Sequence, residues 1–321
     1  MRVAVLSGGR SSEHDVSLRS GASVARGLEA AGHEVVAVTI ARDGRWLSEG
    51  SPLQLCPAAG LLDADVVFPA LHGAFGEDGS VQGLLELLDL PYVGSDVLAS
   101  ATCMDKLTLK RLFAERGIPQ VDFLAYGEDG WRARCETMGL PLWVKPSRMG
   151  SSVGITKVED LTQLDAAVEL ALRHDPRVIV EAGAGGREVE CSVLGNESPR
   201  TSPPGEIIAD ADWYDFEAKY EEGGMELRVP APISPAAAAR VRELAASTFA
   251  LAGCAGLARC DFFVEPDGEV LVNEINTMPG FTETSVYAKL LEADGIAYPD
   301  LCDRLVELAT ERYERARSHE F

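Results

Sequence analysis

The sequence predicts an α/β protein that begins with an open parallel sheet, and three observations carry this prediction. In the first hundred residues, short apolar runs alternate with helical patterns, which is the order of βαβ units with helices on both faces of a sheet. Glycine-rich turns follow these runs, at the place where open α/β sheets bind ligands. The chain has 321 residues, of which 46% are hydrophobic and 25% are charged, so it is long enough for two or three domains with ordinary cores.

The first segment holds three predicted strands and two predicted helices. The strands are the apolar runs Val3–Leu6, Val35–Ile40 and Val66–Ala70, and the second helix is Val81–Leu88. The first helix ends at Gly32 and is predicted to bury Leu18, Ala22, Ala25 and Leu28.

The rest of the chain divides at two places, which predicts domains over residues 1–101, 102–183 and 184–321. The second segment begins near Thr102, and Gly183–Gly186 resembles a hinge before the third. Predicted elements are a helix over Met104–Arg116, strands over Leu142–Lys145 and Val178–Glu181, and a helix from about Leu161. A helix capped by Ser234 is predicted to bury Val241, Leu244, Ala245, Thr248, Phe249 and Ala252. The aperiodic stretch 202–224 is long enough to predict a functional lid loop.

Charge and cysteine content exclude several classes of protein. With 29 basic and 51 acidic side chains, the net charge is −22, which argues against nucleic acid or an anionic membrane as the main partner. No apolar run approaches the roughly 18 residues of a membrane span, and the run before Ser7 is too short for a signal peptide. Seven cysteines without a C-x-x-C pair disfavour a zinc ribbon or a disulfide framework. We therefore expect a cytoplasmic protein.

A β-hairpin near residue 267 is the most informative stretch. Two alternating strands flank Asp267-Gly268, a two-residue turn signal. With that turn, Asp261 lies opposite Glu274 and Arg259 lies opposite Asn276, so that all four polar groups share one face. Opposed carboxylates about 5 Å apart repel unless a cation lies between them. Oxygen ligands suit Mg²⁺, although a solvated polar face remains the alternative interpretation.

The phosphate-binding motifs of the common nucleotide folds are absent. No lysine follows a glycine as in a P-loop, and no G-x-G-x-x-G follows the first strand, which disfavours a nicotinamide dehydrogenase. Lys145 instead ends a strand just before a Ser- and Gly-rich loop, 147–154. Such a loop can offer backbone N–H groups to phosphate beside a lysine, and an ordinary hairpin turn is the alternative.

Two further polar residues lie at predicted strand ends. His72 opens a glycine-rich run in the expected crevice, as either a structural histidine or a substrate contact. Glu13 follows the first strand near the start of a helix. It could favour the helix dipole or hold a cationic amine of a substrate.

Together these motifs resemble the D-alanine–D-alanine ligase family of the ATP-grasp superfamily, in the same order over nearly the whole chain. The matching runs are Gly8-Gly9 with Ser12–Ser17, His72–Gly83, Met104–Lys106, Val144–Pro146, Gly150–Gly154, Tyr214–Tyr220, Arg259–Asp261 and Asn273–Gly280. The resemblance implies a two-part ATP-grasp fold after the Rossmann-like first domain. It also implies formation of D-alanyl-D-alanine from two D-alanine molecules and ATP, through a D-alanyl phosphate, for peptidoglycan synthesis.

The resemblance also implies a role for each site residue. ATP is bound by Lys106, Lys145, Glu181, Glu188 and Lys219, and two Mg²⁺ ions, which Mn²⁺ can replace, by Asp261, Glu274 and Asn276. Substrate D-alanine and its reaction are handled by Glu13, Ser151, Tyr220, Arg259 and Gly280, with His72, Ser285 and Val286 as further substrate contacts. Tyr220 is typical of members that make a peptide bond rather than an ester, and the family implies a homodimer.

Three alternatives stay open at this point. One is a D-alanine–D-lactate ligase, and another is a different ATP-grasp carboxylate–amine ligase. A nucleotide-binding regulator on the same fold is the third. The set of Lys145, Lys219, Asp261, Glu274 and Asn276 argues against the regulator, because a protein that only binds nucleotide needs no such complete set.

Overall fold

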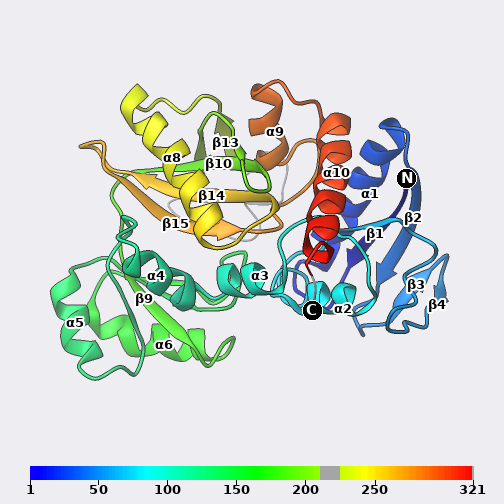
Figure 1. The fold of residues 1–321 in the computed structure, drawn as a ribbon. Coiled ribbons are helices and arrows are strands. Elements are labelled where there is room, and N and C mark those ends of the chain that lie inside the picture. The colour runs from blue at the N-terminus through cyan, green and yellow to red at the C-terminus, as the bar shows by residue number, and fades with distance from the viewer. Residues whose placement is uncertain (210–224, 320–321) are drawn as a thin grey trace.

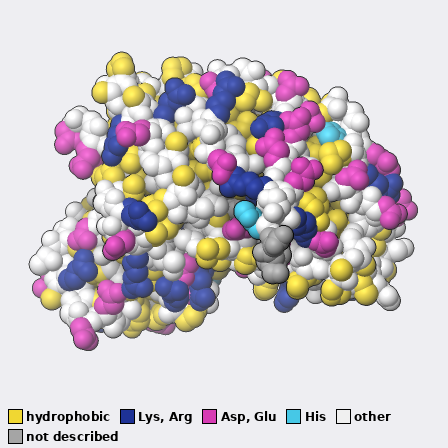
Figure 2. Space-filling view, in the orientation of Figure 1, with side chains coloured by type: hydrophobic (Ala, Val, Ile, Leu, Met, Phe, Trp, Pro, Cys, Tyr) yellow, Lys and Arg dark blue, Asp and Glu magenta, His cyan; other side chains and the backbone are white. Residues whose placement is uncertain are grey.

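Three β-sheets, each built from its own stretch of chain, organise the structure (Figure 1). It is a computed structural model that describes residues 1–209 and 225–319. The three sheets fall within the three predicted segments, whose exact limits as domains stay a prediction. No helix in the described ranges is long and apolar enough to cross a membrane. Acidic and basic side chains are interspersed over the face shown in Figure 2.

The first sheet confirms the predicted parallel βαβ arrangement. Its strands, in spatial order, are β4 (Ser51–Pro52), β3 (Trp46–Ser48), β2 (Glu34–Ile40), β1 (Arg2–Gly8) and β5 (Val66–Pro69). Strand β1 pairs in parallel with β2 and with β5. Val3 and Val5 pack in one core with α1 (His14–Ala30) and α10 (Tyr298–Arg317). Ala4 and Leu6 point the other way, into the core formed with α2 (Ser80–Leu87), so helices cover both faces.

Helix α1 ends as predicted, with Gly32 at a positive φ of 89° just beyond its C-cap. Of its predicted buried face, Leu28 is buried, but the prediction is wrong for the other three residues, because Ala22 is exposed and Leu18 and Ala25 are only half-buried. Small polar residues lie in the interface instead: Ser17 Oγ donates to the carbonyl of Ala70, and Ser20 Oγ lies 2.8 Å from His72 Nε2. A hydrogen-bonded serine can be buried as readily as an apolar residue, which the apolar pattern alone does not reveal.

The second sheet is antiparallel and has the order β6–β9–β7–β8. Its strands are β6 (Phe123–Ala125), β7 (Leu142–Pro146), β8 (Thr156–Val158) and β9 (Val178–Ala182). The helices of this segment are α4 (Lys106–Glu115), α5 (Trp131–Met138) and α6 (Leu164–Leu172), and a 3₁₀ turn at Leu161–Gln163 precedes α6. Helix α3 (Val97–Met104) connects the first segment to the second. The predicted helix over Met104–Arg116 is too long at its start. Asp105 interrupts it, because its carboxylate accepts the backbone N–H of Thr108 and caps α4.

The third sheet lies beside α8 and α9. It contains β10 (Arg187–Gly195), β11 (Arg200–Thr201), β12 (Gly205–Ala209), β13 (Met225–Arg228), β14 (Gly256–Val264) and β15 (Val270–Asn276), with α8 (Pro235–Leu251) and α9 (Val286–Ala293). Ser234 caps α8 through the N–H of Ala237, and the whole predicted face of this helix is buried. The predicted loop 202–224 is wrong in its first part, because Gly205–Ala209 pairs with β10 and β13 as a strand. The remainder, 210–224, lies outside the described residues.

The β14–β15 hairpin has the predicted pairing at the polar positions but a different turn. Arg259 is opposite Asn276 and Asp261 is opposite Glu274. The turn holds three residues rather than two, because the Glu265 N–H donates to the carbonyl of Glu269. This shifts the register by one residue, and a bulge at Asn273 shifts it back. Val270, Val272 and Ile275 can therefore all lie in the core while Glu274 and Asn276 point away from it.

Candidate active site

A cavity of about 300 Å³ is bounded by parts of all three segments. Its lining includes twelve of the residues singled out from the sequence: Glu13, His72, Lys106, Lys145, Ser151, Glu181, Glu188, Arg259, Asp261, Glu274, Asn276 and Gly280. They come from loops after β1, β5 and β15, from loop 147–154, from the start of α4, and from strands of the second and third sheets. The fold thus brings together side chains that are up to 267 residues apart in the chain (280 − 13).

Strand alternation explains which side chains reach the cavity. On β14, Arg259 and Asp261 line it, whereas Cys260 between them is buried in the core beneath α8. On β10, Glu188 and Glu190 line the cavity, and Val189 between them belongs both to the lining and to the core. The second sheet repeats the pattern, with its odd-numbered residues Trp143, Lys145 and Glu181 lining the cavity and Val144 and Val180 packed in the core with α6.

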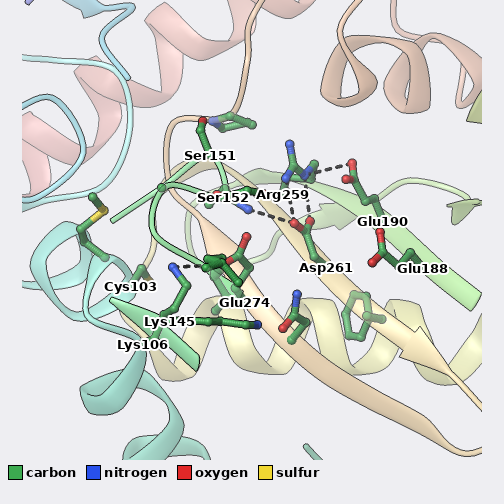
Figure 3. Close-up of a pocket in the computed structure, with 18 of the residues that line it drawn as sticks. Cys103, Lys106, Lys145, Ser151, Ser152, Glu188, Glu190, Arg259, Asp261 and Glu274 are labelled. Carbon is green, nitrogen blue, oxygen red and sulfur yellow. Dashed lines mark hydrogen bonds and ion pairs between the residues drawn. The ribbon is translucent and has the colours of Figure 1, made fainter. Parts of the chain in front are cut away.

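Three acids lie side by side across the third sheet. Glu190 on β10 is opposite Asp261 on β14, which is opposite Glu274 on β15. Arg259 lies among them and points toward Glu190 and Asp261 (Figure 3), with N–O distances of 3.0 and 2.7 Å. Burial would lower the pKa of Arg259, but the charges of Asp261 and Glu190 raise it well above its usual value. Lys106 approaches Glu274 from the opposite side, at 3.4 Å.

A second charged group surrounds Glu181 on β9. Its carboxylate lies 2.5 Å from the ammonium of Lys145 and 3.2 Å from that of Lys110. Burial alone would raise the pKa of Glu181, but the two lysines lower it to about 2. The same carboxylate outweighs the effect of burial on Lys145 and raises the pKa of that lysine. Glu181 is therefore ionised at any physiological pH.

Glu13 and His72 form the wall contributed by the first segment. Ser151 Oγ donates a hydrogen bond to Glu13 Oε1, which joins loop 147–154 to this wall. His72 is buried, with Nδ1 3.1 Å from the carbonyl of Met278 and 3.5 Å from Glu77. Burial lowers the pKa of His72, yet Glu77 and Glu13 together raise it above its usual value. The imidazole thus favours the protonated form more than a free histidine does.

The oxygen-rich face of the hairpin fits a hard divalent cation. Asp261, Glu274 and Asn276 present two carboxylates and an amide, which is a ligand set typical of Mg²⁺ and not of zinc. Arg259 and Lys106 balance the two acids, and Asn276 Nδ2 donates to Asp261 Oδ2 at 3.1 Å. Within residues 1–209 and 225–319, no group of three or more His, Cys, Asp and Glu side chains is arranged to hold a metal.

Four of the residues expected from the sequence are not brought to the cavity by the described part of the chain. Ser285 is the N-cap of α9 and donates to the carbonyl of Thr282, so it and Val286 lie just outside the lining. The two remaining residues, Lys219 and Tyr220, lie outside the described residues.

Three residues that the sequence analysis did not single out belong to the same charged groups: Glu77, Lys110 and Glu190. Glu190 could have been found from its spacing, because it lies two residues after Glu188 on a strand. Lys110 lies four residues after Lys106 and thus on the same side of α4. For Glu77 the sequence offers no comparable signal.

An amino-terminal sheet in which β1 pairs in parallel with β2 and β5 and an antiparallel edge is formed by β3 and β4, followed by two antiparallel sheets that border a lysine- and carboxylate-lined cavity, defines an ATP-grasp protein. Family models described as "D-ala D-ala ligase N-terminus" and "D-ala D-ala ligase C-terminus" match residues 2–60 with 52–95, and residues 112–307. A D-alanine–D-alanine ligase of Deinococcus radiodurans is 48% identical over 97% of this chain and 98% of its own. D-alanine–D-alanine ligase A of Escherichia coli K12 is 42% identical over 98% and 96%. The chain belongs to the D-alanine–D-alanine ligase family.

Solved structures agree with this assignment. The D-alanine–D-alanine ligase from Coxiella burnetii has a TM-score of 0.90 at 36% identity and covers 99% of this chain and 96% of its own. The D-Ala:D-Ser ligase VanG from Enterococcus faecalis has a TM-score of 0.87 at 34% identity, with coverages of 96% and 99%. Enzymes that differ in their second amino acid thus share this fold.

Proposed function

We propose that this chain is an ATP-dependent D-alanine–D-alanine ligase that supplies the dipeptide for peptidoglycan. The γ-phosphoryl group of ATP passes to a carboxylate oxygen of the first D-alanine, which gives an acyl phosphate and ADP. The amine of the second D-alanine then attacks the acyl carbon, and phosphate leaves with the C–O bond electrons. The observation that carries this proposal is that one cavity gathers most of the residues that the family resemblance assigns to ATP, metal and substrate.

Two lysines and two acids of the second and third segments form the ATP part of the site. Lys106 and Lys145 bind phosphate oxygens, while Glu181 and Glu188 contact adenine and ribose. Lys219, from the chain after β12, completes the charge at the γ-phosphate. Phosphoryl transfer depends mainly on positioning and charge neutralisation, and ammonium groups on two sides of one cavity supply both.

Asp261, Glu274 and Asn276 would hold the two Mg²⁺ ions, for which Mn²⁺ can substitute. When bound, the ions neutralise the charge on the phosphate oxygens during transfer. The hairpin itself contributes rigidity, because its paired register fixes Asp261 opposite Glu274.

The first D-alanine binds between the first segment and loop 147–154. Glu13 holds its ammonium group, and Ser151 orients Glu13 through their hydrogen bond, with Tyr220 as a second donor. Arg259 and the Gly280 N–H stabilise the oxyanion that develops at the attacked carbon. One such donor is typically worth about 3–4 kcal/mol of barrier.

The second D-alanine binds next to the first, beside His72. Ser285 and the Val286 N–H receive its carboxylate. Ser285 is close enough for this role, because its Cβ lies 3.9 Å from the position that a Cβ on Gly280 would take. Tyr220 favours an amine over a hydroxyl as the attacking group, so we propose a dipeptide rather than an ester product.

We also propose that the enzyme acts in the cytoplasm and that it is a homodimer, the latter as the family resemblance implies. The proposed function is tested by phosphate release from ATP with D-alanine, L-alanine and D-lactate in parallel. Of these three compounds, only D-alanine should support rapid release of phosphate. Equal release with L-alanine, or release that needs no amino acid, would contradict the proposal.

A further inference from the structure

Lys110 is a buried cation that the proposed mechanism leaves without a role. It is 1% exposed, and it does not belong to the described lining of the cavity. Its ammonium lies 3.2 Å from Glu181 Oε1, yet it finds no hydrogen-bond acceptor of good geometry within residues 1–209 and 225–319. Burial lowers its pKa. Burying a charged lysine costs free energy unless the charge is paired with an acid. The pairing of Lys110 with Glu181 therefore needs a functional explanation.

Glu181 is shared between two lysines in different positions. Lys145 contacts Oε2 from β7 and lines the cavity, whereas Lys110 contacts Oε1 from α4. Of these two lysines, only Lys145 binds the phosphates of ATP in the proposed function. When Lys145 binds phosphate, its charge is shared between the phosphate and a carboxylate 2.5 Å away that is almost fully buried, so Glu181 is less well balanced by Lys145 alone.

An unpaired carboxylate in such a place is strongly unfavourable. If Lys145 were the only partner of Glu181, binding of the nucleotide would leave that charge unbalanced and would therefore be weakened. With Lys110 in place, Glu181 keeps a cation when Lys145 turns to the phosphates.

We propose that Lys110 is a positioning residue for ATP: its charge balances Glu181 and so frees Lys145 to bind the nucleotide phosphates. The inference rests on the proposed function of the cavity. It concerns ATP phosphate binding, and it predicts no direct contact between Lys110 and the nucleotide.

The test compares ATP with adenosine, which lacks phosphate, in wild-type protein and in Lys110→Met, which keeps an unbranched side chain one atom shorter and removes the charge. Lys110→Met should weaken ATP binding at least tenfold and adenosine binding less than about threefold, because the loss falls on the phosphate contact of Lys145. A merely structural role would weaken both ligands alike or lower only the melting temperature. Either of those results, or unchanged ATP affinity in the folded variant, would overturn the proposal.

A second comparison remains informative if Lys110→Met does not fold. Glu181→Gln and the double variant Lys110→Met/Glu181→Gln both lack the carboxylate that Lys110 is proposed to balance. The double variant should therefore bind ATP at least as tightly as Glu181→Gln alone. A loss of tenfold or more between these two would show that Lys110 acts independently of Glu181, and would overturn the inference. Wild-type protein that binds no ATP would instead contradict the proposed function.

Discussion

Two carboxylates, the buried Glu181 and the half-buried Asp261, depend on neighbouring cations in this cavity. Glu181 is balanced by Lys145 and Lys110, and Asp261 by Arg259 through two hydrogen bonds of 2.8 and 2.7 Å. Lys145 and Arg259 also line the cavity where the substrates are proposed to bind (Figure 3). Balanced pairs of this kind hold catalytic side chains in place before substrate arrives, which reduces the reorganisation needed during reaction.

The metal role of the hairpin is tested by Glu274→Gln, which removes a charge and keeps the shape. ATP turnover should fall at least a hundredfold at limiting Mg²⁺, while circular dichroism and the melting temperature remain near the wild-type values. Glu269→Gln, an exposed residue near the turn of the same hairpin, serves as the matched control and should keep full activity. Near-wild-type turnover by Glu274→Gln would contradict the metal assignment.

The lowered pKa of Glu181 predicts a pH dependence of stability. A carboxyl whose pKa falls from its usual 4.5 to about 2 on folding stabilises the native state above pH 4.5, and this contribution is lost as the pH falls toward 2. Its size is about 3 kcal/mol, since one pKa unit corresponds to about 1.4 kcal/mol. Urea unfolding at several pH values should show that Glu181→Gln lacks this acid-side loss. Parallel pH profiles of the variant and the wild type would contradict the prediction.

At the scale of elements, close packing of α1 against α10 connects the two ends of the chain (Figure 1). Gly27 makes this approach possible. A Cβ there would lie 2.7 Å from Cys302 Sγ and 2.8 Å from Tyr298 Cε1, which is closer than real atoms pack. The first segment is thereby fixed to the last helix, and Glu13 at the start of α1 is fixed with it.

A pair of glycine substitutions tests this packing. Gly27→Ala should destabilise the protein by about 1–3 kcal/mol through overpacking. Gly83→Ala in α2 is the matched control, because its new Cβ would have no neighbour closer than Val97 Cγ2 at 3.9 Å. That variant should be stabilised by up to about 1 kcal/mol, since alanine favours a helix over glycine. Equal effects of the two substitutions in denaturant unfolding would contradict the packing argument.

Local patterns in the sequence predict much of this architecture, and the exceptions have identifiable causes. The parallel pairing of β1, the C-cap of α1 and the buried face of α8 follow from apolar periodicity and capping residues. The hairpin pairing at Asp261 holds although the turn was wrong, because the bulge at Asn273 compensates for the longer turn. The buried serines of α1 escape prediction, since their burial depends on partners such as His72 that are distant in the chain.

At the scale of the whole molecule, the cavity exists only where three segments meet. The Ser151–Glu13 hydrogen bond joins loop 147–154 to the first segment, and the His72 contact with the Met278 carbonyl joins the first to the third. Such contacts depend on how the sheets pack, which single-sequence patterns do not specify. The family resemblance nevertheless identifies Glu13, Ser151 and His72 as site residues from the sequence.

The choice of second substrate is also a property of the whole cavity, since relatives of the same fold include a D-Ala:D-Ser ligase. The most direct test of the account is product analysis after wild-type enzyme receives ATP, Mg²⁺ and equal concentrations of D-alanine, D-lactate and D-serine at pH 7. We predict that mass spectrometry will show mainly D-alanyl-D-alanine, with one ADP and one phosphate formed per dipeptide. A product that is mainly D-alanyl-D-lactate or D-alanyl-D-serine, or ADP formed without any ligated product, would contradict it.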